Sequence, residues 1–209
     1  MPLENAVGTP VGLHAMNKNR LEAFSDGVIA IIITIMVLEF KVPHGEALAD
    51  LLPLWPVFLS YVLSFVNVGI YWNNHHHLMH AVKKVNGAVL WANLNLLFWL
   101  SLMPFATAWM GENHFAAMPV VVYCIDLCLC AAAYTLLQSR IIQLEGEQSV
   151  LQQALGSDVK GKISLASYVL AIPLALYGLP WLSGLLVGLV ACIWFIPDRR
   201  IEKKLNLEP

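Results

Sequence analysis

Apolar residues are grouped along this chain in six long segments, which shorter polar stretches separate. A membrane-spanning helix needs about 20 mostly apolar residues. We therefore predict an all-α membrane protein with six transmembrane helices, over 20–40, 53–79, 87–110, 117–138, 163–179 and 180–197. The last two segments are short and are separated by little more than Gly178 and Pro180, so we expect them to form a tight helical hairpin.

The composition favours an integral membrane protein over a soluble one. Hydrophobic residues make up 58% of the 209 residues and charged residues 12%, and the mean hydropathy is +0.67. Soluble domains usually carry about 25% charged residues. The net charge of −2 predicts no nucleic-acid partner. The first 19 residues lack a basic start that leads into an apolar core, so we expect no cleavable signal peptide.

The basic residues are shared unequally between the two ends of the predicted helices. One end has only Lys41, and the other has Lys18, Arg20, Lys83, Lys84, Arg140, Lys160, Lys162, Arg199, Arg200, Lys203 and Lys204. The positive-inside rule then predicts that both termini are cytoplasmic. We divide the chain into a tail over 1–19, a six-helix transmembrane domain over 20–197 and a basic tail over 198–209. Residues 139–162 are expected to extend helices near the membrane surface.

The first predicted helix is unusual because half of it is polar. Arg20, Glu22, Ser25 and Asp26 occupy positions where a lipid-facing helix would be apolar. Such groups are expensive inside a bilayer and usually face protein or a water-filled path. We therefore expect this helix to lie at the centre of a helix bundle.

A helical wheel at about 100° per residue separates this helix into two faces. One face carries an aliphatic stripe with Thr34 at its edge, formed by Arg20, Phe24, Gly27, Ile31, Ile35 and Leu38. The opposite face carries Glu22, Ser25, Asp26, Ile29 and Ile33. Ser25 and Asp26 should hydrogen-bond to neighbouring helices, since an unpaired buried carboxylate is costly. Periodicity alone favours ordinary packing as the role of the aliphatic stripe.

Several motifs resemble those of a known family. Arg20-x3-Phe24-Ser25-Asp26-Gly27, followed by Ala30-Ile31-x2-Thr34, resembles the first-helix signature of the transmembrane protein 175 family. Downstream, Trp72-x2-His75-His76-x-Leu78 resembles the end of its second helix, and Asn93 with Pro104-Phe105 resembles its third. The resemblance covers essentially the whole chain in order.

The resemblance implies a potassium-permeable channel in a prokaryotic cell membrane. Members with one six-helix unit assemble as homotetramers whose pore is lined by the first helix. By this resemblance, Ile31 forms the apolar constriction, Ile35 and Leu38 follow it, and the hydroxyl of Thr34 contributes potassium selectivity. The family lacks a carbonyl filter, and this sequence has no Thr-Val-Gly-Tyr-Gly segment. Because Thr34 is the only hydroxyl in the second half of the helix, we expect modest selectivity.

Polar residues on the next helices are candidates for holding the first helix in place. The resemblance assigns His75, with Trp72 and Asn93, as partners of Ser25 and Asp26. His76 and His80 have the spacing of a metal-ligand pair, but no acidic or cysteine ligand is near in sequence, so we expect no metal site and no cofactor. The histidine run can also titrate near neutral pH.

Other chemistry receives less support from the sequence. The spacing of Cys124, Cys128, Cys130 and Cys192 is no zinc pattern, so we expect buried apolar cysteines. Asp126, an acid within the fourth span, has either a functional or a packing role. The alternative function is a proton or cation transporter that uses Asp26, Asp126 and the histidines. No nucleophile or phosphate-binding motif supports an enzyme, and a structural membrane protein without flux stays open.

Overall fold

The computed structural model describes residues 18–82, 84–146, 151 and 158–195, and every regular element in these ranges is helical. The predicted all-α class is therefore confirmed for the part of the chain described. Of the expected tails over 1–19 and 198–209, residues 1–17 and 198–209 lie outside it, as does most of 147–157, whereas Lys18 and Asn19 belong to the first helix. The elements are α1 (Lys18–Leu38), the short 3₁₀ helix η1 (Leu48–Leu54), α2 (Trp55–Ala81), α3 (Gly87–Glu112), α4 (Ala117–Glu145), α6 (Val159–Leu176) and α7 (Pro180–Trp194).

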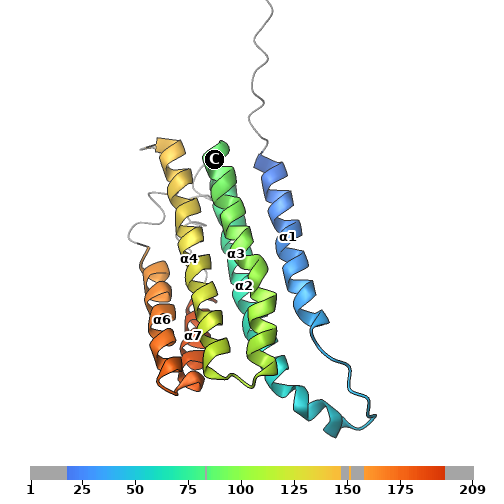
Figure 1. Ribbon diagram of the computed structural model, residues 1–209. Coiled ribbons are helices and arrows are strands. Elements are labelled where there is room, and N and C mark those ends of the chain that lie inside the picture. The colour runs from blue at the N-terminus through green and yellow to red at the C-terminus, as the bar shows by residue number, and fades with distance from the viewer. Residues whose placement is uncertain (1–17, 83, 147–150, 152–157, 196–209) are drawn as a thin grey trace, which may run out of the picture.

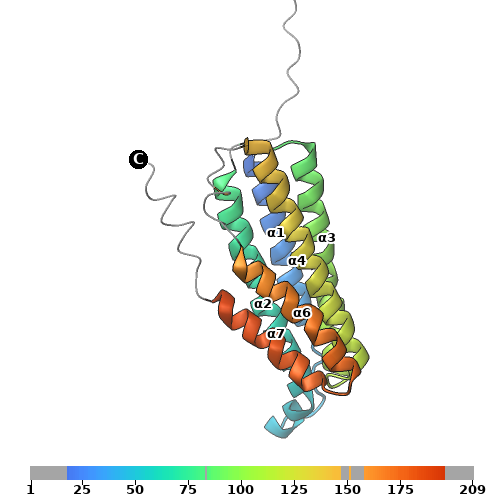
Figure 2. The ribbon, with the colours of Figure 1, turned by 90° about the vertical axis from the view of Figure 1, so that its left-hand side faces the viewer.

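The long helices run up and down alongside one another (Figure 1). Helix α3 packs against α1, α2 and α4, and α1 also packs against α2. The hairpin of α6 and α7 covers the other side of α4, and α7 also contacts α2 (Figure 2). Helix α1 therefore lies at one edge of the bundle, and α6 with α7 at the opposite edge. The expectation that the first helix lies at the centre of a bundle is thus wrong for the single subunit.

Within the described residues, five helical segments are long and apolar enough to cross a membrane, whereas six spans were predicted. The bounds of these five differ from the predicted ones mainly at the ends. Helix α4 continues to Glu145, so part of the segment expected to extend a helix does so. It ends at Gly146, whose φ of 74° suits glycine. Helix α7 has 15 residues, which is about 22 Å at 1.5 Å per residue and shorter than a hydrocarbon core of about 30 Å.

The segment before the second span differs from the expected start at residue 53. Residues Leu48–Leu54 form a 3₁₀ helix, and α2 begins only at Trp55. Pro53 lies inside the 3₁₀ helix and Pro56 in the first turn of α2. Pro56 has no amide proton to leave unpaired there, which makes the start of a helix a favourable place for it.

Small and hydroxyl-bearing residues, rather than large apolar ones alone, join the helices. Ser64 Oγ of α2 lies 2.6 Å from Thr107 Oγ1 of α3 and 3.0 Å from the Tyr123 hydroxyl of α4, and all three residues are buried. Ser183 of α7 donates to the Ala171 carbonyl of α6 at 2.7 Å. In lipid there is little hydrophobic drive between helices, so such bonds and close packing hold a bundle together.

Helices α2 and α3 approach each other closely at Gly111. A Cβ atom at this position would lie 2.8 Å from the Val57 Cα and would collide with the Ser60 Oγ. Because a backbone atom of α2 is among the neighbours, rotation of a side chain cannot make the required space. Gly111 therefore sets the spacing of these two helices near the end of α3.

We expect Gly111→Ala to destabilise the protein by about 1–3 kcal/mol, as overpacking of a filled core does. Gly188→Ala in α7 is the matched control, because a Cβ atom there meets nothing within 4 Å. Thermal unfolding of the purified protein in detergent, followed by tryptophan fluorescence, measures the difference. Equal melting temperatures for the two variants would contradict the proposed close approach.

Candidate functional site

Helix α1 presents one face to the bundle and leaves the other uncovered in the single subunit. The buried face consists of Leu21, Ser25, Ile29, Ile32 and Met36. The uncovered face is the aliphatic stripe of the sequence analysis, in which the exposed fraction is 57% for Ile31 and 78% for Leu38. Ile35, Phe24 and Thr34 are exposed on the same side. The two faces fall where the helical wheel puts them.

Asn93 connects three helices through two hydrogen bonds. Its Nδ2 donates to Ser25 Oγ of α1 at 2.9 Å, and its Oδ1 lies 2.8 Å from His75 Nε2 of α2. Since Oδ1 can only accept, His75 carries a proton on Nε2. Ser25 in turn donates to the Leu21 carbonyl at 2.8 Å. All three polar side chains are buried, so the bonds join α1, α2 and α3 in a site shielded from water.

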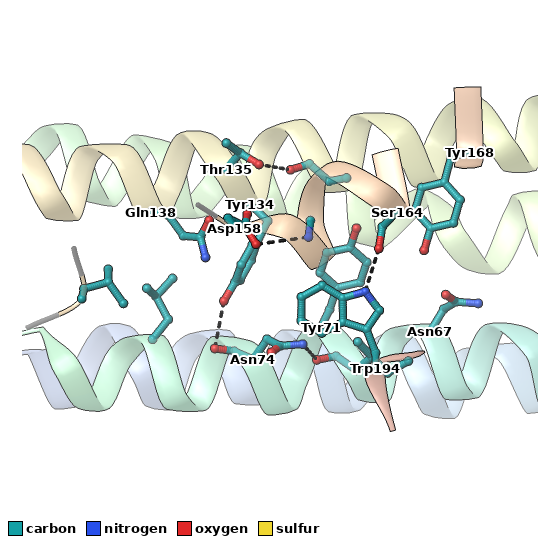
Figure 3. A pocket seen from close by; sticks show the side chains of 15 residues that line it. Asn67, Tyr71, Asn74, Tyr134, Thr135, Gln138, Asp158, Ser164, Tyr168 and Trp194 are labelled. Atoms are coloured by element: carbon teal, nitrogen blue, oxygen red, sulfur yellow. Dashed lines mark hydrogen bonds between the residues drawn. The ribbon is translucent and has the colours of Figure 1, made fainter. Parts of the chain in front are cut away.

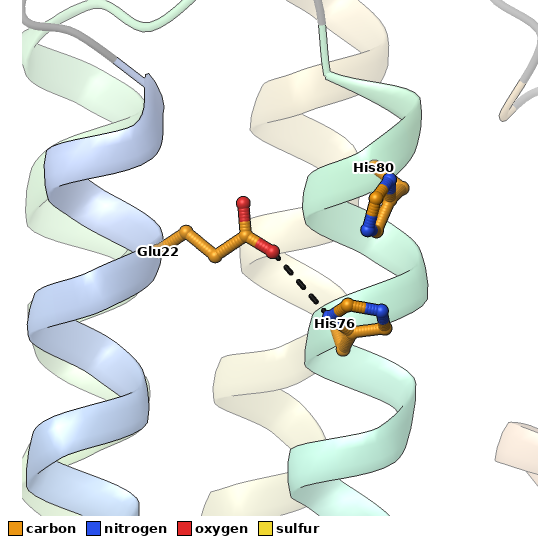
Figure 4. A group of neighbouring side chains, drawn as sticks. All are labelled: Glu22, His76 and His80. Atoms are coloured by element: carbon orange, nitrogen blue, oxygen red, sulfur yellow. Dashed lines mark ion pairs between the residues drawn. The ribbon is translucent and has the colours of Figure 1, made fainter.

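Two further polar contacts join α1 to α2. Trp72 Nε1 donates to Asp26 Oδ1 at 3.1 Å. His76 Nδ1 lies 3.4 Å from Glu22 Oε1 (Figure 4). The structure thus brings Trp72, His75 and Asn93 to Ser25 and Asp26, whereas Arg20 and Phe24 lie on the exposed side of α1. We call Ser25, Asp26, Trp72, His75 and Asn93 the anchoring network.

The contact between Glu22 and His76 was missed by sequence reasoning. Glu22 shares the polar face of α1 with Ser25 and Asp26, three and four residues on, and that spacing was the available signal. The sequence does not give the axial offset between α1 and α2, which is their relative height in the bundle. This height decides which histidine of the run meets Glu22.

Thr34 has its hydroxyl directed back to its own helix. The Thr34 Oγ1 lies 3.1 Å from the Ala30 carbonyl and 2.9 Å from the Ile31 carbonyl. A hydroxyl that donates to the backbone keeps its oxygen lone pairs available as acceptors. Because Thr34 is exposed on the edge of the aliphatic stripe, this oxygen is accessible from outside the subunit.

Asp126 and the cysteines lie away from α1. Asp126 is only 5% exposed, and neither of its carboxylate oxygens has a hydrogen-bond partner within the part of the chain that the structure describes. The four cysteines are free; Cys124 and Cys130 are buried and Cys128 is half-buried. The expectation of burial is wrong for Cys192, which is exposed because it lies on the outer side of α7.

A pocket that sequence reasoning did not find lies between α2, α4, α6 and α7 (Figure 3). Its wall is aromatic and amide-bearing, with Asn67, Tyr71, Asn74, Tyr134, Gln138, Tyr168 and Trp194. Tyr134 donates to the Asn74 carbonyl at 3.1 Å and Trp194 Nε1 to Ser164 Oγ at 2.8 Å. No α1 residue lines it, so it is separate from the aliphatic stripe and the anchoring network.

A family model described as "Endosomal/lysosomal potassium channel TMEM175" matches residues 20–104, which contain most of α1, all of α2 and most of α3. A protein of Chryseobacterium sp. (strain P1-3) named as a potassium channel is 59% identical over 191 residues, covering 91% of this chain and 99% of that protein. The human protein named endosomal/lysosomal proton channel TMEM175 is 34% identical over 116 residues, covering 50% of this chain and 23% of its own.

Solved structures show the same architecture. The crystal structure of a lysosomal potassium-selective channel TMEM175 homolog from Chamaesiphon minutus superposes with a TM-score of 0.73 at 28% identity, covering 87% of this chain and 97% of the other. That of the potassium channel MtTMEM175 gives 0.61 at 15% identity, which supports the fold alone. These relatives are ion channels and not enzymes. Since the Chryseobacterium relative matches over nearly its whole length, the chain belongs to the TMEM175 family.

Proposed function

We propose that this protein is a potassium-preferring cation channel whose pore is lined by α1 from several copies of the chain. The observation that carries the proposal is that the aliphatic stripe of α1 is exposed in the single subunit. The opposite, polar face of α1 is held against α2 and α3 by hydrogen bonds. The relatives named as potassium channels support the choice of ion. Ion transport across a membrane is thus the function that the fold and the family favour together.

A single subunit cannot enclose a pore with one helix at the edge of its bundle. An apolar groove lies beside the stripe between α1 and α3, with Ile31, Ile35 and Phe105 among its lining residues. A second copy seated there would cover the groove and bring its own α1 beside the first. We propose the homotetramer that the family resemblance implies, with four α1 helices around the axis.

The constriction of this pore is proposed to be a ring of Ile31 side chains, followed by rings of Ile35 and Leu38. A cation in such a ring loses water ligands and gains none from the aliphatic side chains. Narrow apolar rings therefore gate by dewetting, and a small widening admits water and ions. This arrangement needs no carbonyl filter and no bound cofactor.

Potassium preference is proposed to depend on the Thr34 hydroxyl. Its proton is directed to the carbonyl oxygens of Ala30 and Ile31, so its lone pairs are free to contact a cation. A ring of four such oxygens replaces part of the hydration shell of an ion. One ring offers fewer ligands than a carbonyl filter, which agrees with modest selectivity.

The orientation in the membrane is proposed from charge. The start of α1, the end of α2 and the end of α4 lie at one end of the bundle (Figure 1), and Lys18, Arg20, Lys84 and Arg140 are in or next to these segments. At the other end, Lys41 forms an ion pair of 2.6 Å with Glu112, whose hydrogen bond raises the pKa of Lys41. We propose cytoplasmic termini and a prokaryotic plasma membrane.

Proton permeation is the second candidate, because the vertebrate relatives are named proton channels. The transporter alternative used Asp26, Asp126 and the histidines. Of these, Asp26 and His75 hydrogen-bond within the anchoring network, and Asp126 is on α4. A path through the aliphatic stripe would not pass them.

Potassium-loaded liposomes that contain the purified protein should release potassium faster than potassium-loaded liposomes without protein. A pH-sensitive dye reports the release when a protonophore lets protons enter in exchange. Sodium-loaded vesicles should respond more slowly. Omission of the protonophore tests the second candidate, since a signal then requires protons to cross the protein. Protein-containing vesicles that behave as empty ones would refute the channel.

Ile31→Asn should wet the constriction and raise potassium flux, because an amide side chain stabilises water in a narrow ring. Ile125→Asn is the matched control: Ile125 is also exposed but lies on α4, away from the stripe. The same liposome assay compares the two variants. Flux that is unchanged in Ile31→Asn, or raised equally in both, would remove Ile31 from the constriction.

Thr34→Val should lower the potassium-to-sodium flux ratio by about two- to tenfold, since one hydrogen-bond-like contact contributes about 0.5–1.5 kcal/mol. Valine has nearly the shape of threonine, so packing is preserved and the oxygen alone is lost. Thr34→Ser keeps the hydroxyl and should retain the ratio. The measurement is the reversal potential of reconstituted channels in mixed potassium and sodium solutions. An unchanged ratio in Thr34→Val would contradict the role.

A further inference from the structure

Glu22, His76 and His80 converge between α1 and α2, at the end of the bundle where α1 begins and α2 ends (Figure 4). Their ligand atoms all lie within 4.8 Å of one another. Glu22 Oε1 is 3.4 Å from His76 Nδ1, and the rings of His76 and His80 are 4.4 Å apart between centroids. Three groups that bind metals thus come from two helices to one point.

These separations suit a tetrahedral metal ion. Zinc binds imidazole nitrogen at about 2.0–2.1 Å and carboxylate oxygen at about 2.0–2.2 Å, which places neighbouring ligand atoms about 3.3 Å apart. Glu22 and His76 already have this separation. His80 is four residues from His76 on the same helix, so a small rotation of its exposed side chain completes the set. Two imidazoles and one carboxylate favour zinc, cobalt or nickel over calcium or magnesium.

We propose that Glu22, His76 and His80 form a binding site for a divalent transition-metal ion such as Zn²⁺, which joins α1 to α2. The three protein ligands leave a fourth position for water. The missing acidic ligand, which made the histidine pair unconvincing in sequence, is supplied by α1 from more than 50 residues away.

The surroundings of the cluster orient the His76 ring and engage the end of α2. Trp72 stacks beside the His76 ring, with centroids 6.3 Å apart, and is itself fixed by its bond to Asp26. Lys18 Nζ donates to the His80 carbonyl at 3.2 Å, so its ammonium group is engaged with the end of α2. Glu22 and His76 are half-buried, whereas exposed His80 leaves a route for the ion.

An ion pair between Glu22 and His76 explains only part of the geometry. It does not involve His80, whose ring lies edge-on to the His76 ring with centroids 4.4 Å apart. A metal ion accounts for all three, because it requires both rings to be neutral and directs a lone pair of each to one centre.

One consequence rests on the proposed function. A bound ion would fix the distance between α1 and α2, and α1 is the proposed pore helix. If the Ile31 ring widens by movement of α1, Zn²⁺ should lower potassium flux in the wild-type channel. Failure of the channel proposal itself would leave the binding measurement unaffected.

The test begins with Co²⁺ titration of the full-length protein in detergent after removal of metals by chelation. We expect visible ligand-field absorption typical of tetrahedral coordination, saturating at one Co²⁺ per chain, and its displacement by Zn²⁺. Glu22→Gln and His80→Ala should each lose the absorption and weaken Zn²⁺ binding more than about tenfold, since even substitutions outside the first coordination shell cost 10–100-fold. Circular dichroism verifies that both variants are folded.

His77→Ala is the matched control, because His77 belongs to the same histidine run but lies outside the cluster. It should bind Co²⁺ as the wild type does. Absence of tetrahedral Co²⁺ absorption in the wild type, or its survival in both ligand variants, would overturn the site. Binding that leaves potassium flux unchanged in a conducting wild-type channel would overturn the regulatory consequence alone.

Discussion

The hydrogen bonds of Asn93 fix the rotation of α1 about its own axis, and the other features of the site depend on that rotation. Asn93 of α3 bonds to Ser25 of α1 and to His75 of α2, so the polar face of α1 must point into the subunit. Ile31 and Leu38 are on the opposite face, so they point away from the subunit. A buried amide with both of its ends occupied is costly to disturb, because each lost bond leaves a polar group unpaired.

The same use of polar residues recurs through the bundle. Ser64, Thr107 and Tyr123 join α2, α3 and α4, and Ser183 joins α7 to α6. In a membrane these bonds select one packing arrangement where apolar surfaces alone would accept many. In helices that are apolar on all sides, a few hydroxyls and amides at the contacts determine which side of each helix packs against its neighbours.

Much of this could be read from the sequence, and the remainder depends on how helices lie beside one another. Segment length and apolarity predict the helices, and the 3.6-residue period separates Ser25 from Ile31. Neither gives the relative height of two helices, so the contact of Glu22 with His76 was missed. The 3₁₀ helix over Leu48–Leu54 is short and has no period of its own. The pocket between four helices likewise has no linear pattern.

The distribution of contacts along α1 makes it mechanically uneven. The side chains that bond it to α2 and α3 come from its first nine residues, Lys18 to Asp26. The twelve residues after them, Gly27 to Leu38, contact the bundle through apolar side chains, without the directional hydrogen bonds that hold the first nine. Leu38 is about 18 Å beyond Asp26 along the helix, so a tilt of about 5° displaces it by about 1.6 Å. One end of the helix is thus a fixed support, and the other end is a lever arm whose small deflection would change the bore of the proposed pore.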